Sequence, residues 1–61
     1  MSPKRFQDWQ ARMGWSAAEV SKRLGKSPDT ISDYRNKGVP KAQAQVVGLA
    51  MAALEHRLEP V

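Results

Sequence analysis

The chain has 61 residues, enough for one small domain. A chain of this length buries only about 60% of the surface that its unfolded form exposes, so its hydrophobic core is marginal. The chain holds no cysteine and one histidine, which excludes disulfides and thiolate zinc sites, and we expect no cofactor or metal. Ten Lys and Arg against six Asp and Glu give a net charge of +4, which favours a polyanionic partner.

The pattern of polar residues indicates a protein that stays out of membranes. The longest run without a charge, residues 42–54, has 13 residues, fewer than the roughly 20 that a membrane-spanning helix needs. Gln7, Asp8 and Gln10 occupy the positions where a signal peptide requires an apolar stretch. We therefore expect a cytoplasmic protein.

Pro, Gly and Ser residues divide the chain into four segments, each predicted to be a helix, and no stretch has the alternation of a strand. The first helix is predicted over residues 3–13, with Ser2 as its cap and Pro3 at its first position. Gly14 follows as a left-handed closing residue. The apolar side chains of this segment recur at spacings of three and four and share one face: Phe6, Trp9 and Met13.

The second helix begins with a capping box, in which the Ser16 hydroxyl and the Glu19 carboxylate each satisfy a free backbone amide. Trp15 and Val20 flank the box as a hydrophobic staple, and Gly25 ends the helix. The third helix is predicted over residues 28–36, again after a Ser cap and a Pro. It has two apolar anchors, so most of its circumference is exposed. These anchors are Ile31 and Tyr34.

The fourth helix, predicted over residues 40–58, has an apolar arc about twice as wide as a core-facing helix needs. Two adjacent stripes form this arc. The first stripe comprises Val47, Ala50, Met51, Leu54 and Leu58, and the second comprises Ala42, Val46, Leu49 and Ala53. Three short helices cannot cover so much apolar surface, so we expect a symmetric homodimer. The predicted interface comprises Val46, Leu49, Ala53 and Arg57, with Leu54 or Leu58 shared between core and interface.

The two central helices, joined by a short turn containing Gly, form a predicted helix-turn-helix over about residues 16–37. Residues 15–38 resemble the helix-turn-helix of the Cro and phage-repressor family, also called the xenobiotic-response-element-like family. The resemblance is carried by Ser16, Ala17, Val20, Ser21, Leu24-Gly25-Lys26-Ser27, Thr30-Ile31-Ser32 and Tyr34. Departures from the family pattern are Ala17 for Gln, Tyr34-Arg35 for Trp-Glu, and no fifth helix.

This resemblance implies an all-α, compact four-helix lambda-repressor-like domain over residues 1–61. It implies a sequence-specific regulator that binds double-stranded DNA, most simply a dimeric repressor of phage or mobile-element type on a palindromic operator. Such a protein would work at the nucleoid of a bacterial or phage-infected cell. The base-reading positions that the resemblance implies are Pro28, Asp29, Ser32 and Asp33. The expected phosphate contacts are Lys26, Ser27, Arg35, Asn36, Lys37 and Lys41.

Several residues have two interpretations. Asp29 and Asp33 could accept a hydrogen bond from cytosine, or Asp29 could simply complement the dipole of its helix. Trp9 and Trp15 could stack on bases, although their positions favour packing in the core. Tyr34 is expected to be a core anchor whose hydroxyl reaches solvent or a phosphate.

The main functional alternative is a protein-interaction module, antitoxin-like or adaptor-like, that uses the apolar fourth helix. We expect no enzymatic activity, because no histidine pair, Gly-rich phosphate loop or set of nucleophile and base is present. RNA binding is disfavoured because the sequence predicts no open aromatic surface. No small-molecule ligand is evident from the sequence.

Overall fold

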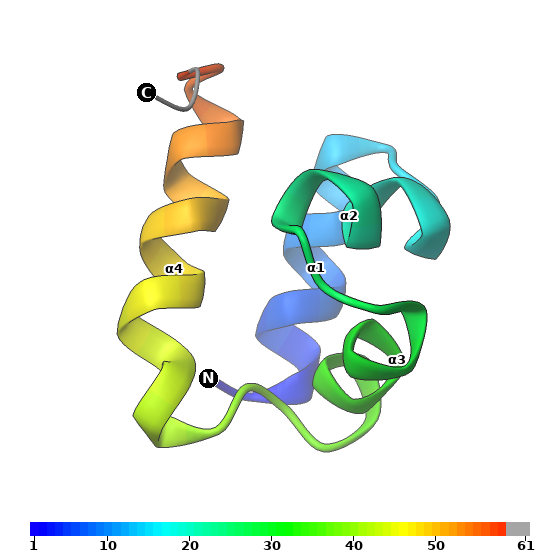
Figure 1. The fold of residues 1–61 in the computed structure, drawn as a ribbon, viewed down its shortest axis with the longest axis vertical. Coiled ribbons are helices and arrows are strands. Elements are labelled where there is room, and N and C mark those ends of the chain that lie inside the picture. The colour runs from blue at the N-terminus through cyan, green and yellow to red at the C-terminus, as the bar shows by residue number, and fades with distance from the viewer. Residues whose placement is uncertain (59–61) are drawn as a thin grey trace.

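The computed structural model describes residues 1–58 and contains four helices, with no strand in that range (Figure 1). The helices are α1 (Pro3–Met13), α2 (Ala17–Leu24), α3 (Pro28–Asn36) and α4 (Lys41–Glu55). The prediction of a compact all-α domain with four helices is confirmed. Residues 59–61, the end of the predicted domain, lie outside the described residues. Within the described part, no helix combines the length and apolar character needed to cross a bilayer.

Three serines start the first three helices, as the sequence predicts. Ser2, Ser16 and Ser27 are extended, and each hydroxyl oxygen accepts a hydrogen bond from the backbone N–H three residues later, at 3.2 Å. The capping box of α2 is present only on its serine side. The Glu19 carboxylate instead accepts a hydrogen bond from Arg23 Nε at 2.7 Å. It therefore binds a side chain one turn later in α2 and not a backbone amide at the start of the helix.

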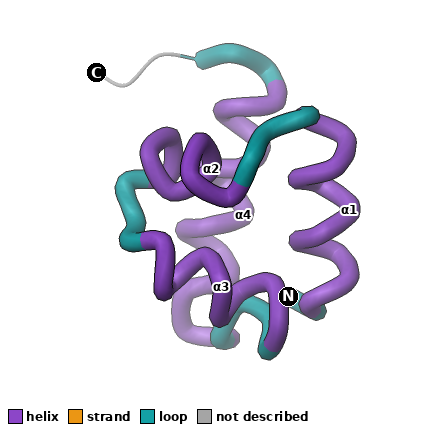
Figure 2. Tube along the Cα trace, turned by 90° about the vertical axis from the view of Figure 1, so that its right-hand side faces the viewer, coloured by secondary structure: helices purple, strands orange, loops and turns teal. Residues whose placement is uncertain are grey.

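The helices enclose one core, in which α3 packs against both α1 and α2 while α4 packs against α2 (Figures 1 and 2). Ser21 of α2 is buried with this core, with 8% of its surface exposed. The buried apolar residues come from all four helices and the turn before α4: Phe6, Trp9, Val20, Ile31, Tyr34, Val39, Val47 and Met51.

All four aromatic residues of the chain form one row of ring contacts through this core. The ring centroids of Trp15 and Trp9 lie 5.9 Å apart, those of Trp9 and Phe6 5.9 Å, and those of Phe6 and Tyr34 5.5 Å. Tilted and edge-to-face geometries at these distances are attractive. The row therefore joins the turn after α1 to the inner side of α3, and both tryptophans take the packing role.

Residues 38 and 39 connect α3 to α4 and pair with the first residue of the chain. The Val39 N–H donates to the Met1 carbonyl oxygen at 2.9 Å, and the Met1 amino group donates to the Val39 carbonyl oxygen at 3.1 Å. Gly38 has a φ of +91°, and a Cβ atom at this position would collide with the Met1 carbonyl oxygen. Both the backbone conformation and the close approach therefore require glycine here.

The end of α4 differs from the prediction, which extended this helix to residue 58. The helix ends at Glu55, and Arg57 is left-handed with a φ of 58°. The N–H groups of Leu58 and Arg57 donate to the carbonyl oxygens of Ala53 at 2.8 Å and Leu54 at 3.1 Å, which is a Schellman closure without glycine. After this closure Leu58 is 63% exposed, so of Leu54 and Leu58, the two residues predicted as alternatives for sharing between core and interface, Leu58 has no core contact within residues 1–58.

Candidate functional site

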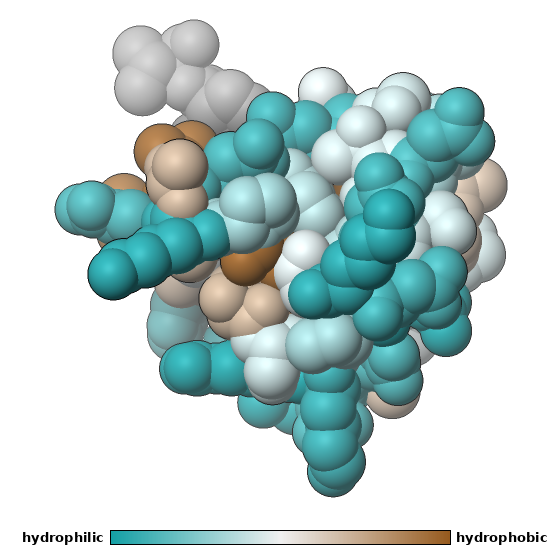
Figure 3. Space-filling view, turned by 90° about the horizontal axis from the view of Figure 1, so that it is seen from below, coloured by the Kyte–Doolittle hydropathy of each residue, from teal (hydrophilic) through white to brown (hydrophobic). Residues whose placement is uncertain are grey.

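The outer side of α3 is a continuous polar face. Ile31 and Tyr34, at 0% and 2% exposure, hold the inner side of the helix in the core. The outer side carries the four predicted base-reading residues and Asn36, all of them exposed: Pro28, Asp29, Ser32, Asp33 and Asn36. We call these five residues the α3 face. Figure 3 views the end of the molecule where α3 and the following turn lie, and hydrophilic side chains cover most of it.

Two side-chain hydrogen bonds connect α3 to α4 and to α1. The Tyr34 hydroxyl donates to Gln43 Oε1 of α4 at 2.6 Å, and Gln7 Nε2 of α1 donates to the Arg35 carbonyl oxygen. The prediction that the Tyr34 hydroxyl reaches solvent or a phosphate is therefore wrong, because Gln43 binds it. Sequence reasoning missed both glutamines, since neither has a local pattern that indicates a partner 9 or 28 residues away.

The polar groups of the α3 face have weak partners within their own helix. Asp33 Oδ1 lies 4.0 Å from Lys37 Nζ, and both side chains are well exposed. Asn36 Nδ2 donates to Ser32 Oγ at 3.3 Å. Exposed contacts of this kind contribute little to stability and exchange readily for other partners. Asp33, Ser32 and Asn36 are therefore accessible to a ligand that approaches the face.

Cationic residues precede and follow α3 along the chain. Lys26 precedes the helix, Lys37 follows it directly and Lys41 begins α4, and all three are exposed. Arg35 is half-buried and lines a hollow between α3 and the start of α2 together with Ala17, Pro28, Ser32 and Asn36. The sixth predicted phosphate contact, Ser27, already accepts the Thr30 N–H with its hydroxyl oxygen.

Arg23 lies outside this set of cations. Its guanidinium carbon is 4.3 Å from the centroid of a Trp15 ring, and its Nε binds Glu19. The Arg23 side chain therefore packs on Trp15, at the end of the aromatic row, and its partners are residues of the protein itself.

The exposed side of α4 is apolar. Val46 and Leu49 are 68% and 65% exposed, whereas Ala53 and Leu54 are half-buried. Leu54 packs against the core. Of the two leucines predicted to be shared between core and interface, it is the one with a core contact. Arg57 lies beyond the end of α4, in the left-handed turn, and so is not on the helical stripe where it was predicted. The exposed stripe, defined by Val46, Leu49 and Ala53, borders a shallow hollow lined by Leu24, Lys26, Val46, Val47 and Ala50.

No family model matches this chain, and neither a curated protein nor a solved structure matches it. Functional inference therefore rests on the residues of the chain itself. Among residues 1–58, no three His, Cys, Asp or Glu side chains come together as metal ligands would. Two surfaces that the sequence predicted have a distinct chemistry, the α3 face with its flanking cations and the exposed apolar stripe of α4.

Proposed function

We propose that this protein is a sequence-specific transcription regulator with a lambda-repressor-like helix-turn-helix fold, which binds double-stranded DNA through the α3 face. The role we propose is that of a dimeric repressor of phage or mobile-element type, acting on a palindromic operator in the cytoplasm. The observation that carries the proposal is the exposed polar side of α3, with Lys26 before the helix and Lys37 and Lys41 after it.

The dimensions and chemistry of α3 suit the major groove. A helix with its side chains is about 10–12 Å across, close to the roughly 12 Å width of the groove. Asp29 and Asp33 supply acceptors for the amino group of cytosine, and Ser32 can bond to either base type. The flanking lysines, with Arg35 and Asn36, would bind phosphates on the two sides of the groove, which sets the register of the helix.

Dimerisation through α4 would give the two half-sites of a palindrome. A pair of such domains reaches sites about 34 Å apart when they lie one helical turn apart. The exposed Val46 and Leu49 support this interface, because two such side chains side by side favour burial. Leu49→Glu places a charge at the centre of the interface and should give monomers with weaker operator binding. An unchanged dimer in sedimentation would place the interface elsewhere.

The same stripe favours one competing function, a protein-interaction module that uses α4 on a different protein. The two functions differ in their dependence on salt. Binding to DNA releases counterions, so the logarithm of the affinity falls with the logarithm of the salt concentration, by about 0.9 per phosphate contacted. Docking of an apolar stripe lacks this steep dependence.

The decisive experiment is selection of binding sites from random duplexes, followed by a salt titration on the selected duplex. We expect a palindromic sequence. The double variant Arg35→Ala/Lys37→Ala should reduce the salt slope by about two, since each cation neutralises one phosphate. Lys4→Ala is the control, because Lys4 is about as exposed as Lys37 but belongs to α1. Failure to enrich any duplex, or an unchanged slope in the double variant, would refute the assignment.

A further inference from the structure

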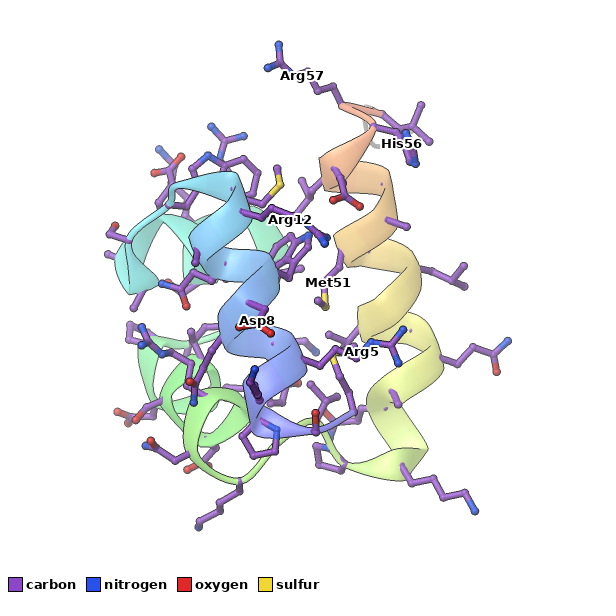
Figure 4. All side chains as sticks on the ribbon, turned by 180° about the vertical axis from the view of Figure 1, so that it is seen from behind. Arg5, Asp8, Arg12, Met51, His56 and Arg57 are labelled. Carbon is purple, nitrogen blue, oxygen red and sulfur yellow. The ribbon has the colours of Figure 1, made fainter. Side chains whose placement is uncertain are left out.

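A groove separates α1 from α4 on the side of the molecule away from α3. It forms because α1 packs mainly against α3 while α4 packs mainly against α2. Its lining includes Arg5, Trp9 and Arg12 from α1, and Gly48, Met51 and Ala52 from α4. In Figure 4, Arg5 and Arg12 extend from α1 toward α4 near the two ends of this seam, and Met51 lies between them.

A residue at the floor of the groove has a hydrogen-bond donor without an acceptor. Trp9 is 3% exposed, and its Nε1 atom is buried with no hydrogen-bond partner among residues 1–58. A buried donor left in this state costs about 1–3 kcal/mol, and nearly all such groups in folded proteins have a partner. Met51 shares the floor, and its unbranched side chain can move to admit an acceptor.

The α4 side of the groove leaves room for a flat apolar group. Gly48 has no side chain, and a Cβ atom built on it would meet no atom within 4 Å. Ala52, one turn later on the same side, adds a single methyl group. The groove has a volume of about 340 Å³, near the lower end of the range of small-molecule sites.

The charges at the rim leave one cation uncompensated. Arg12 Nη2 binds Glu55 Oε1 at 2.6 Å, and Asp8 is paired with Lys4 at 3.7 Å. Arg5 has no ion pair among residues 1–58. The balance at the rim therefore favours an anionic ligand over a cationic one.

We propose that this groove binds a small carboxylate with an apolar, planar body. The carboxylate pairs with Arg5 and accepts the hydrogen bond of Trp9 Nε1, while the body lies over Gly48 and Ala52. The α3 face contributes nothing to this site, so the inference stands whether or not the protein binds DNA.

Nuclear magnetic resonance of the two indole N–H groups tests the proposal, with benzoate as the probe and benzamide as its neutral counterpart. We expect benzoate to move the Trp9 indole cross-peak with saturation in the millimolar range, and benzamide to bind at least tenfold more weakly. Arg5→Ala should weaken benzoate binding about tenfold or more, since hydrogen bonds to charged groups are strong. Gly48→Leu should abolish binding, because the new side chain fills the groove.

Folding of these variants is not at risk, because Arg5 is exposed and leucine is a better helix former than glycine. Far-ultraviolet circular dichroism checks this. The proposal is overturned if benzoate causes no saturable shift in folded protein, if benzamide binds equally well, or if binding survives in Gly48→Leu. It is also overturned if the indole proton contacts a long-lived water that benzoate does not displace.

Discussion

Among residues 1–58, the hydrogen bond from Tyr34 to Gln43 is the one side-chain hydrogen bond that joins α3 to α4, and Tyr34→Phe removes it without changing the shape of the core. The net contribution of such a bond is about 1 kcal/mol. Gln43 is exposed, so its freed oxygen bonds to water and adds no burial penalty. In a domain of this size, about 1 kcal/mol lowers the Tm by roughly 4–8 °C.

Thermal unfolding followed by circular dichroism measures this loss, and a double-mutant cycle with Gln43→Ala isolates the bond from other effects of each change. We expect a coupling energy of about 1 kcal/mol between the two positions, because neither single variant removes another described contact of the pair. A coupling below about 0.3 kcal/mol, which is within the additivity of independent sites, would show that the bond does not link the two helices.

Two further predictions concern the backbone. Gly38→Ala should destabilise the protein by about 2 kcal/mol or more, because a strained φ is combined with a collision with the Met1 carbonyl oxygen. Gly14→Ala is its control, since Gly14 is also left-handed but has open space around it, so an equal loss would contradict the role of the collision. Arg57→Gly should raise the Tm by a few degrees, because the left-handed conformation costs an arginine about 1 kcal/mol and costs a glycine little. An unchanged or lower Tm would contradict this.

The starts of the helices were predictable because their signals are local. The hydroxyl groups of Ser2, Ser16 and Ser27 each bind a backbone amide three residues later. Gly25 ends α2 because it is itself the C-terminal cap of that helix. The polar side of α3 was predictable for the same reason, since Ile31 and Tyr34 alone define its inner side.

Other features depend on contacts that a sequence pattern does not contain. The end of α4 was missed because Arg57 adopts a left-handed conformation that glycine usually supplies. The destination of the Tyr34 hydroxyl required knowing that Gln43, near the start of α4, lies within hydrogen-bond distance of it. The groove beside Trp9 arises from how α1 and α4 are spaced, which periodicity does not determine.

The row of four rings has a consequence for spectroscopy. Every aromatic chromophore belongs to α1, α3 or the turn after α1, while α4, the longest helix with 15 residues, carries none. Trp9 nevertheless lines the groove between α1 and α4 together with Met51, so detachment of α4 would expose Trp9 to water and shift its emission while the other helices keep their helical signal. A melting curve from tryptophan emission that precedes the one from circular dichroism would therefore reveal that α4 opens before the rest of the domain melts.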